Sequence, residues 1–312
     1  MRRRKYLRRK SISNVSDFTG CMLCPRECGV NRDTTYGYCH VGNEPVVARA
    51  ALHMWEEPCI SGESGSGAVF FAGCNMGCVF CQNADISQGS EPGRRISGER
   101  LCEIFFELKE AGANNINLVT GDMFLPAIKK AVKKAQSEGL NLPFILNTSS
   151  YIHTGVLKDM EGLIDIYLAD LKYARNEDAI RYSNARGYVE YAKAAIDEMV
   201  RQKPECVFDD NGILQSGVIV RHLLMPGMLI QAKMITDYLY KRYGDRIYIS
   251  LMDQYTPNGH LADYPEIDRA VSDREYRSLI RYAENLGITN AYVQEGDTAD
   301  LCYVPKFDLT GV

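Results

Sequence analysis

Several features are missing from the 312-residue sequence, and each absence excludes a class of protein. No apolar run approaches the roughly 18 residues that a membrane-spanning helix needs, so we expect no membrane association. The first ten residues carry seven Lys or Arg, but no apolar segment follows them, which argues against a secretory signal. No internal repeat or low-complexity linker is visible. The body of the chain is acidic overall, so we expect no nucleic-acid partner.

Cysteine, by contrast, is plentiful. The chain has eleven cysteines, and seven of them lie in two tight groups. Disulfide scaffolds belong mainly to short secreted chains, whereas this chain is long and shows no secretory signal. Metal ligation in a reducing compartment is therefore the better interpretation of both groups. We expect the protein in the cytoplasm.

One group is the motif Cys74-x3-Cys78-x2-Cys81, which directly follows the apolar run Ala68–Ala72. Three thiolates on a glycine-flanked loop can hold one small inorganic cluster. A cubane [4Fe–4S] cluster normally takes four cysteines, so one iron would stay open to another ligand. The alternative is a zinc knuckle, but zinc requires four ligands in a closed site. No fourth Cys or His follows soon after Cys81, which favours the cluster.

The other group comes earlier, at Cys21, Cys24, Cys28 and Cys39, with the spacing C-x2-C-x3-C-x10-C. Four thiolates suit a structural zinc ion or an auxiliary iron–sulfur cluster. The spacing does not distinguish a zinc ion from an iron–sulfur cluster at this site, and we favour the cluster slightly over zinc. Reduced thiols without a metal are a third interpretation.

From residue 67 onward, apolar runs alternate with amphipathic stretches, which is typical of a parallel sheet with crossover helices. The predicted strands are Ala68–Ala72, Asn115–Thr120, Pro143–Asn147, Ile164–Leu171, Gly217–Met225, Arg246–Met252 and Asn290–Gln294. The predicted helices are Glu99–Ala111, Leu125–Glu138, Tyr188–Arg201, Ile230–Tyr243 and Asp273–Asn285. Six or seven such units predict an incomplete α/β barrel with its chemistry at the carboxyl ends of the strands.

This pattern predicts four segments. Residues 1–20 form a basic N-terminal tail, 21–62 a cysteine-rich metal module, 63–297 the partial barrel, and 298–312 a C-terminal tail. Polar side chains follow successive predicted strands, and in a barrel they would converge on one mouth above the cysteine loop.

The C-x3-C-x2-C motif after a strand resembles the signature of the radical S-adenosylmethionine (SAM) superfamily. Further stretches resemble its glycyl-radical-enzyme activating branch, in a subgroup similar to pyruvate formate-lyase activating enzyme. They are Leu23–Arg26, Leu52–Gly62, Cys81–Asn83, Asn115–Thr120, Asp165–Tyr173, Val220–Leu223 and Ser250–Pro257. The resemblance implies a partial (βα)6 TIM-like barrel of the radical SAM type, preceded here by the small cysteine-rich module.

The resemblance also implies cofactors and partners. Cys74, Cys78 and Cys81 would hold a [4Fe–4S] cluster whose open iron binds SAM. Flavodoxin or ferredoxin would supply the electron, and a glycyl radical enzyme would be the partner that is activated. A small-molecule or peptide substrate is the alternative, and an iron–sulfur or zinc binding and sensing protein is a third hypothesis. Activating enzymes usually carry additional cysteines after the motif, whereas here they precede it.

Within this resemblance, Thr120, Gly121 and Asp122 stand where the superfamily often has Gly-Gly-Glu, which recognises the amino group of SAM. Asp170 and Lys172 match an Asp-x-Lys motif, in which the Lys meets the SAM carboxylate and the Asp helps to hold a monovalent cation.

A monovalent cation is a further candidate cofactor that the resemblance implies. Asn147 falls where that cation site has an Asp, so the site would lack one carboxylate ligand here. Arg221 would contact the SAM carboxylate or ribose, and Tyr255 stands where a His can contact the nucleoside. SAM carries a carboxylate and an ammonium group, so its site needs both a cation and an acid.

Overall fold

The computed structural model describes residues 19–88, 92–257, 261–294 and 304–312. Most of the predicted N-terminal tail, and residues 298–303 of the predicted C-terminal tail, lie outside the described residues. Ten strands are described: β1 (Val46–His53), β2 (Ser66–Phe71), β3 (Arg94–Arg95), β4 (Ile116–Val119), β5 (Phe144–Thr148), β6 (Ile166–Asp170), β7 (Val207–Phe208), β8 (Leu214–Leu223), β9 (Tyr248–Met252) and β10 (Ala291–Val293). All seven predicted strands are confirmed, as β2, β4, β5, β6, β8, β9 and β10.

Helices connect the strands. The α-helices are α1 (Pro58–Ser61), α2 (Ala84–Ser87), α3 (Gly98–Glu110), α4 (Leu125–Ser137), α5 (Thr154–Asp159), α6 (Asn176–Ser183), α7 (Tyr188–Gln202), α8 (Leu229–Tyr243) and α9 (Asp273–Asn285). Two 3₁₀ helices are η1 (Gly121–Phe124) and η2 (Gly244–Arg246). The five predicted helices are confirmed as α3, α4, α7, α8 and α9. α9 begins with a capping box, in which Ser272 and Glu275 satisfy each other's backbone amides.

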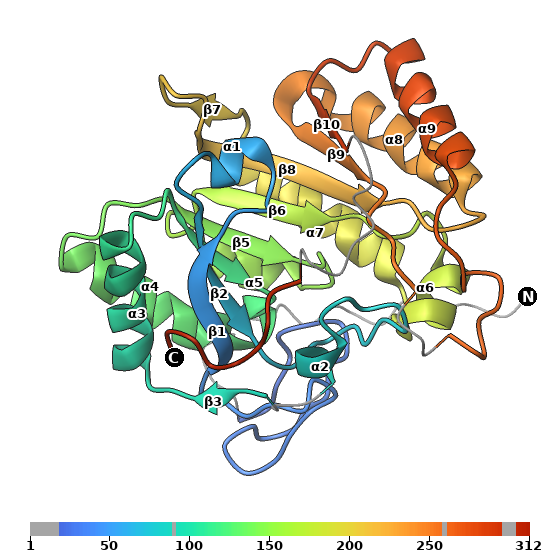
Figure 1. The fold of residues 1–312 in the computed structure, drawn as a ribbon. Helices are drawn as coiled ribbons and strands as arrows, with labels where there is room; N and C mark the ends of the chain where they lie inside the picture. The colour runs from blue at the N-terminus through green and yellow to red at the C-terminus, as the bar shows by residue number, and fades with distance from the viewer. Residues whose placement is uncertain (1–18, 89–91, 258–260, 295–303) are drawn as a thin grey trace, which may run out of the picture.

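The strands form one continuous sheet in the order β10-β9-β8-β6-β5-β4-β2-β1-β3. From β10 to β2 every neighbouring pair is parallel, and β1 then pairs antiparallel with β2 and β3. Within the described residues, no pairing joins β10 to β3, so the barrel stays open. The predicted partial α/β barrel is therefore confirmed (Figure 1).

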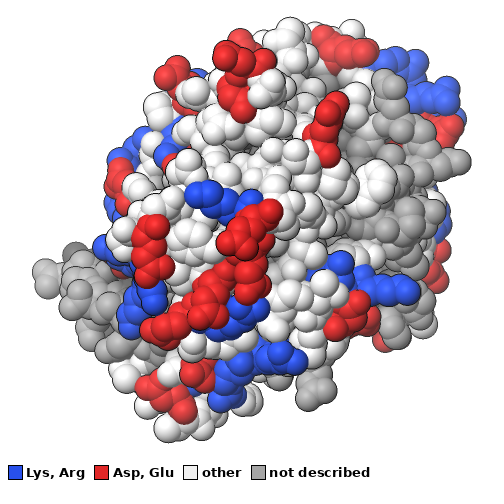
Figure 2. Space-filling view, turned by 60° about the vertical axis from the view of Figure 1, so that its left-hand side comes forward, with Lys and Arg blue, Asp and Glu red and all other residues white. Residues whose placement is uncertain are grey.

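The strands are buried on both faces where the barrel is packed. Every residue of β4 and of β5 is buried, as expected for parallel strands that helices cover on one side. Helices α3 and α4 pack against each other outside β2 and β4, on the left of Figure 1. Figure 2 shows that the face brought forward from that side carries acidic and basic side chains interleaved. Arg100 of α3, for example, pairs with Glu103 and Glu107.

Strand β1 was not among the predicted strands, and it ties the N-terminal module to the barrel. It lies inside the predicted module of residues 21–62 and pairs with β2 from His53–Ser66 to Val47–Phe71. The C-terminal residues run along β1 as well, because Leu309 and Thr310 exchange backbone hydrogen bonds with Ala48 and Ala50. The module, the barrel and the C-terminal segment thus share one sheet edge.

Candidate active site

The cysteine loop leaves the carboxyl end of β2 and bends through two glycines. Gly73 and Gly77 have φ values of +84° and +72°, in the left-handed region that favours glycine. Several donors point at the loop's sulfur atoms: for example, the backbone N of Met76 lies 3.3 Å from Cys74 Sγ, and the Ser183 hydroxyl lies 2.9 Å from Cys78 Sγ. Hydrogen bonds of this kind are what ligating thiolates accept, so the loop fits an iron–sulfur cluster.

The thiols themselves are buried. Burial raises the pKa of Cys74 to about 11 and that of Cys78 to about 11, although Lys172 opposes the shift at Cys78. Without a metal these groups therefore hold their protons at neutral pH, and metal binding would release them. In the described part of the chain, no three His, Cys, Asp or Glu side chains are gathered closely enough for a single metal ion. A four-iron cluster spreads its ligands farther apart than one ion does.

A pocket of about 240 Å³ opens beside the loop, on the inner face of the sheet. We call it the SAM pocket, after the ligand that the resemblance described above implies for these residues. It is lined by the three loop cysteines and by five of the predicted contact residues, Thr120, Asn147, Asp170, Lys172 and Arg221. These side chains come from the ends of β4, β5, β6 and β8, so the expected convergence is observed.

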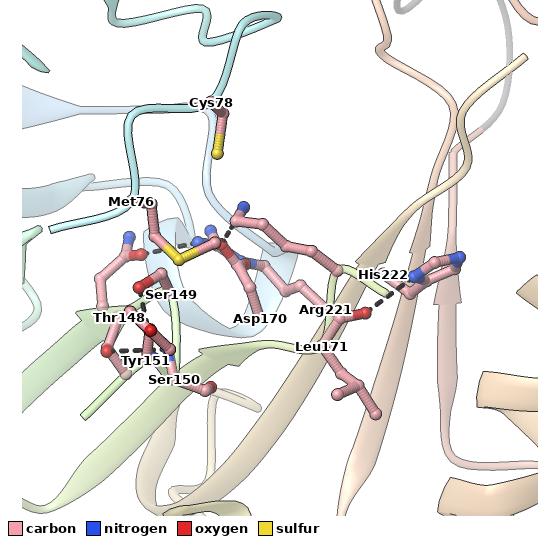
Figure 3. Close-up of polar contacts among 12 residues, drawn as sticks. Met76, Cys78, Thr148, Ser149, Ser150, Tyr151, Asp170, Leu171, Arg221 and His222 are labelled. Carbon is pink, nitrogen blue, oxygen red and sulfur yellow. Dashed lines mark hydrogen bonds and ion pairs between the residues drawn. The ribbon is translucent and has the colours of Figure 1, made fainter. Parts of the chain in front are cut away.

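The charged groups of the SAM pocket form one network. Asp170 receives Lys172 Nζ at 2.6 Å and Arg221 Nε at 3.0 Å. Burial alone would raise the pKa of Asp170, but the two cations outweigh it and the pKa lies below its usual value. Arg221 also donates to Asn147 Oδ1 at 2.6 Å. Figure 3 shows the Cys78 sulfur directed toward this group of side chains.

Sequence reasoning missed Glu56 as a member of this network. Its carboxylate accepts from Arg221 at 3.2 Å, from Asn117 at 2.9 Å and from Asn147 at 3.2 Å. Glu56 lies between β1 and α1, before the first predicted strand, so no strand-end pattern marked it. The signal available was its place in the family-like stretch Leu52–Gly62. Neighbouring His53 and Trp55 also line the pocket.

Asp122 lies elsewhere than expected. It does not line the SAM pocket, although its Oδ1 accepts from the hydroxyl of Thr148, which does. Burial raises the pKa of Asp122 to about 7. Thr120, just before it, has a left-handed backbone (φ +58°), and Gly121 begins the 3₁₀ helix η1. That turn directs the Asp122 side chain away from the SAM pocket, toward the N-terminal cysteines.

Tyr255 is also outside the lining of the SAM pocket. Its hydroxyl donates to the Ile267 carbonyl at 2.8 Å, and its ring packs on Phe80. The preceding residue, Gln254, lines the pocket instead, and its carbonyl accepts from the side chain of Gln82 at 2.7 Å.

The four N-terminal cysteines do come together. Cys21, Cys24, Cys28 and Cys39 line one small cavity of about 20 Å³, which we call the cysteine cavity. Burial raises the pKa of Cys24 to about 12, and the other three thiols add to the shift. Asp122 and Asn75 of the barrel complete the wall of this cavity.

Fold and site together define an open α/β barrel enzyme with a three-cysteine loop at the carboxyl ends of its strands. Residues 68–228, more than half of the chain, match the Radical SAM superfamily. The chain therefore belongs to the radical SAM superfamily, whose members combine a [4Fe–4S] cluster with SAM.

Individual relatives add the following. The chain is 29% identical to the uncharacterized protein MJ0674 of Methanocaldococcus jannaschii over 282 residues, 88% of this chain and 77% of that protein. A radical SAM methyltransferase from Sphaerobacter thermophilus has a TM-score of 0.52 at 16% identity, covering 75% of this chain and 68% of the methyltransferase. Methylornithine synthase (PylB) has a TM-score of 0.48 at 14% identity, over 76% of this chain and 68% of the synthase. The methyltransferase supports the fold alone. No described helix is long and apolar enough to cross a membrane.

Proposed function

We propose that the protein cleaves SAM reductively at a cluster held by Cys74, Cys78 and Cys81 and abstracts a hydrogen atom from a substrate. The observation that carries this proposal is the shared lining of the SAM pocket, where these thiols meet Lys172 and Arg221. A bound, reduced cluster would supply the one electron needed to split SAM into methionine and a 5′-deoxyadenosyl radical, and transfer of a substrate hydrogen atom to that radical would give 5′-deoxyadenosine.

The chain's own side chains would position SAM in this pocket. Lys172 and Arg221 carry the positive charge that a carboxylate needs. Both are held by Asp170, so they are fixed in place before the ligand arrives. Thr120 and Asn147 line the same pocket and offer uncharged hydrogen-bonding groups. The acid expected at Asp122 is not in the lining, so we assign the SAM ammonium to Asp170 or to backbone carbonyls of the pocket.

The test is a turnover assay under anaerobic conditions. The protein is reconstituted with iron and sulfide, reduced with dithionite and supplied with SAM. We expect 5′-deoxyadenosine and methionine in equal amounts, measured by chromatography. Cys102→Ala is the matched control for variants of the loop cysteines, because Cys102 is a buried cysteine of α3 outside both sites. It should form 5′-deoxyadenosine like the wild type. A fully loaded protein that forms no 5′-deoxyadenosine would refute the proposal.

For the substrate, we propose a backbone glycine of a partner protein. The motif Asp170-Leu171-Lys172, with its 2.6 Å ion pair, supports this assignment through the resemblance to activating enzymes. The test uses pyruvate formate-lyase as the probe, incubated with the reduced protein and SAM. We expect the doublet of a glycyl radical by electron paramagnetic resonance (EPR). Formation of 5′-deoxyadenosine without a protein radical would instead indicate a small-molecule or peptide substrate.

We further propose that Cys21, Cys24, Cys28 and Cys39 hold a second metal centre, and that a monovalent cation binds beside Asp170. Backbone amides donate to three of these sulfurs, at Cys24, Cys28 and Cys39, as they do around ligating thiolates. Metal analysis of a Cys74/Cys78/Cys81 triple-alanine variant identifies the filling. About four remaining irons would mean an auxiliary cubane cluster, and about one zinc would mean a structural site. Potassium dependence of SAM binding tests the cation.

A further inference from the structure

The wall of the cysteine cavity is built jointly by the N-terminal module and the barrel. Asn75, inside the loop of Cys74, Cys78 and Cys81 that we call the radical SAM loop, and Asp122, after β4, both line it. Their oxygens Asn75 Oδ1 and Asp122 Oδ2 are buried and have no hydrogen-bond partner among the described residues. A buried oxygen without a donor is energetically unfavourable, so a group that donates to it would stabilise the cavity wall. A centre in this cavity would therefore lie against the loop that carries Asn75 as well as the four cysteines.

Arg26 joins the two regions directly. It lies between Cys24 and Cys28, and its guanidinium donates to the Asn75 carbonyl at 2.8 Å and to the Met76 carbonyl at 3.0 Å. Both carbonyls belong to the loop that carries Cys74 and Cys78. On its other side the guanidinium reaches carbonyls at the end of α6, Ser183 at 3.3 Å and Asn184 at 2.5 Å.

Tyr38 completes the contact between the two loops. The guanidinium of Arg26 lies 3.7 Å from the centre of the Tyr38 ring, and the Tyr38 hydroxyl donates to the Met76 carbonyl at 3.3 Å. There is no room for a side chain at this interface. A Cβ at Gly77 would lie 2.9 Å from the Tyr38 hydroxyl, and one at Gly73 would lie 2.7 Å from the Cys39 carbonyl.

The residues that Arg26 holds also contact a cluster ligand. Ser183 accepts from Arg26 through its carbonyl and donates through its hydroxyl to Cys78 Sγ at 2.9 Å. Tyr173 shares the same hydroxyl at 2.5 Å. Hydrogen bonds to sulfur and nearby positive charge are two factors that set the reduction potential of an iron–sulfur cluster.

We propose that Arg26 is a positioning residue that couples metal loading of the cysteine cavity to the reduction potential of the cluster at Cys74, Cys78 and Cys81. The inference rests on the proposed function. A metal bound by Cys24 and Cys28 fixes the backbone on both sides of Arg26. The guanidinium then holds the radical SAM loop in place, and its charge favours the reduced cluster. Loss of the metal frees this segment and withdraws both effects.

The first test replaces Arg26 and follows the cluster by an EPR-monitored redox titration. Arg26→Gln removes the charge and most of the donors, whereas Arg26→Lys keeps the charge and loses the planar fork. We expect a more negative potential in Arg26→Gln, and 5′-deoxyadenosine formation slowed about tenfold to a hundredfold by the displaced loop. Arg26→Lys should retain most of the potential and still lose rate. Arg277→Lys, at an exposed surface ion pair with Asp273, is the matched control and should match the wild type.

If Arg26→Gln binds too little iron for the redox titration, two further variants test the same inference. Cys24→Ser with Cys28→Ser empties the cysteine cavity and leaves Arg26 present. Tyr38→Phe removes a single hydroxyl from the same contact. We expect both to shift the potential in the same direction as Arg26→Gln, Tyr38→Phe by less.

Two outcomes overturn the inference. One is an unchanged potential in Arg26→Gln that is folded and iron-loaded, and the other is an unchanged potential after loss of the second metal. Failure of the proposed function is a separate result. It would show as absent 5′-deoxyadenosine in the wild type, while the potential of the cluster can still be measured.

Discussion

The two cysteine-bearing regions use the same side chain in different structural settings. Cys74, Cys78 and Cys81 follow a buried strand, and the ends of β4, β5, β6 and β8 supply the groups around them. Cys21, Cys24, Cys28 and Cys39 lie on a segment of turns that precedes β1. The first region is positioned by the sheet, whereas the second is held by turns, by side-chain contacts and, as we propose, by a bound metal. We therefore expect the first to keep its shape without metal and the second to lose it.

The largest expected effect is on catalysis. Replacing Cys74, Cys78 and Cys81 together by alanine should abolish 5′-deoxyadenosine formation and lower the iron content by about four atoms per chain. The fold should persist, because the barrel does not depend on this loop. Far-ultraviolet circular dichroism and metal analysis check both statements. If the triple variant still formed 5′-deoxyadenosine, the loop of Cys74, Cys78 and Cys81 would not be the catalytic one of the two cysteine regions.

Metal removal should affect the second region selectively. After treatment with a chelator, we expect hydrogen exchange to accelerate at residues 21–45, because these residues have little secondary structure to hold them. The strands β4 and β5 should stay protected, since all their residues are buried. Mass spectrometry of peptic fragments makes the comparison. Equal protection of both regions with and without chelator would contradict it.

Ion pairs stabilise the first region, and the variant Arg221→Met should show how much they contribute to the free energy of unfolding. This change leaves the half-buried Glu56 without its cation and the half-buried Asp170 with Lys172 alone. We expect a cost of about 3 kcal/mol of unfolding free energy, the lower end of the range for breaking a buried pair. Arg242→Met is the control, because the pair Arg242–Asp197 is exposed and worth about 0–1 kcal/mol. Urea denaturation of cluster-free protein measures both. Similar losses in the two variants would show that the network contributes no more than a surface pair.

The smallest expected effect concerns His222, next to Arg221 on β8. Burial lowers the pKa of His222 from 6.5 to about 4, and its Nδ1 lies 2.9 Å from the Leu171 carbonyl. Below pH 6.5 His222 is protonated in the unfolded chain but stays neutral in the folded chain. The free energy of unfolding therefore decreases as the pH falls toward 4. Between pH 7.5 and 5.5 we expect a loss of roughly 1.4 kcal/mol.

His222→Gln should lack this part of the pH dependence. Urea denaturation of both cluster-free proteins at pH 7.5 and pH 5.5 provides the comparison. An equal loss of unfolding free energy between pH 7.5 and pH 5.5 in wild type and variant would show that His222 does not stay neutral in the folded protein.

The sequence by itself determined the order of the parallel strands, the positions of the five long helices and the place of the cysteine loop. The apolar runs are short, bounded and separated by amphipathic stretches, so periodicity alone located the parallel strands. The roles of Lys172 and Arg221 as SAM contacts were implied by the resemblance to radical SAM enzymes, and the strand pattern placed both residues at strand ends. These inferences depend only on which residues lie near one another along the chain, and the sequence shows that directly.

Only the tertiary structure decided what reaches the pocket and how the two cysteine groups relate. Glu56 enters the network because β1 folds back along β2, which brings a residue from before the barrel under β8. Asp122 turns toward the N-terminal cysteines because Thr120 takes a left-handed backbone, so residue type did not predict its direction. Arg26 meets the radical SAM loop about fifty residues away in sequence. Such contacts depend on which surfaces pack together, and spacing along the chain does not encode that.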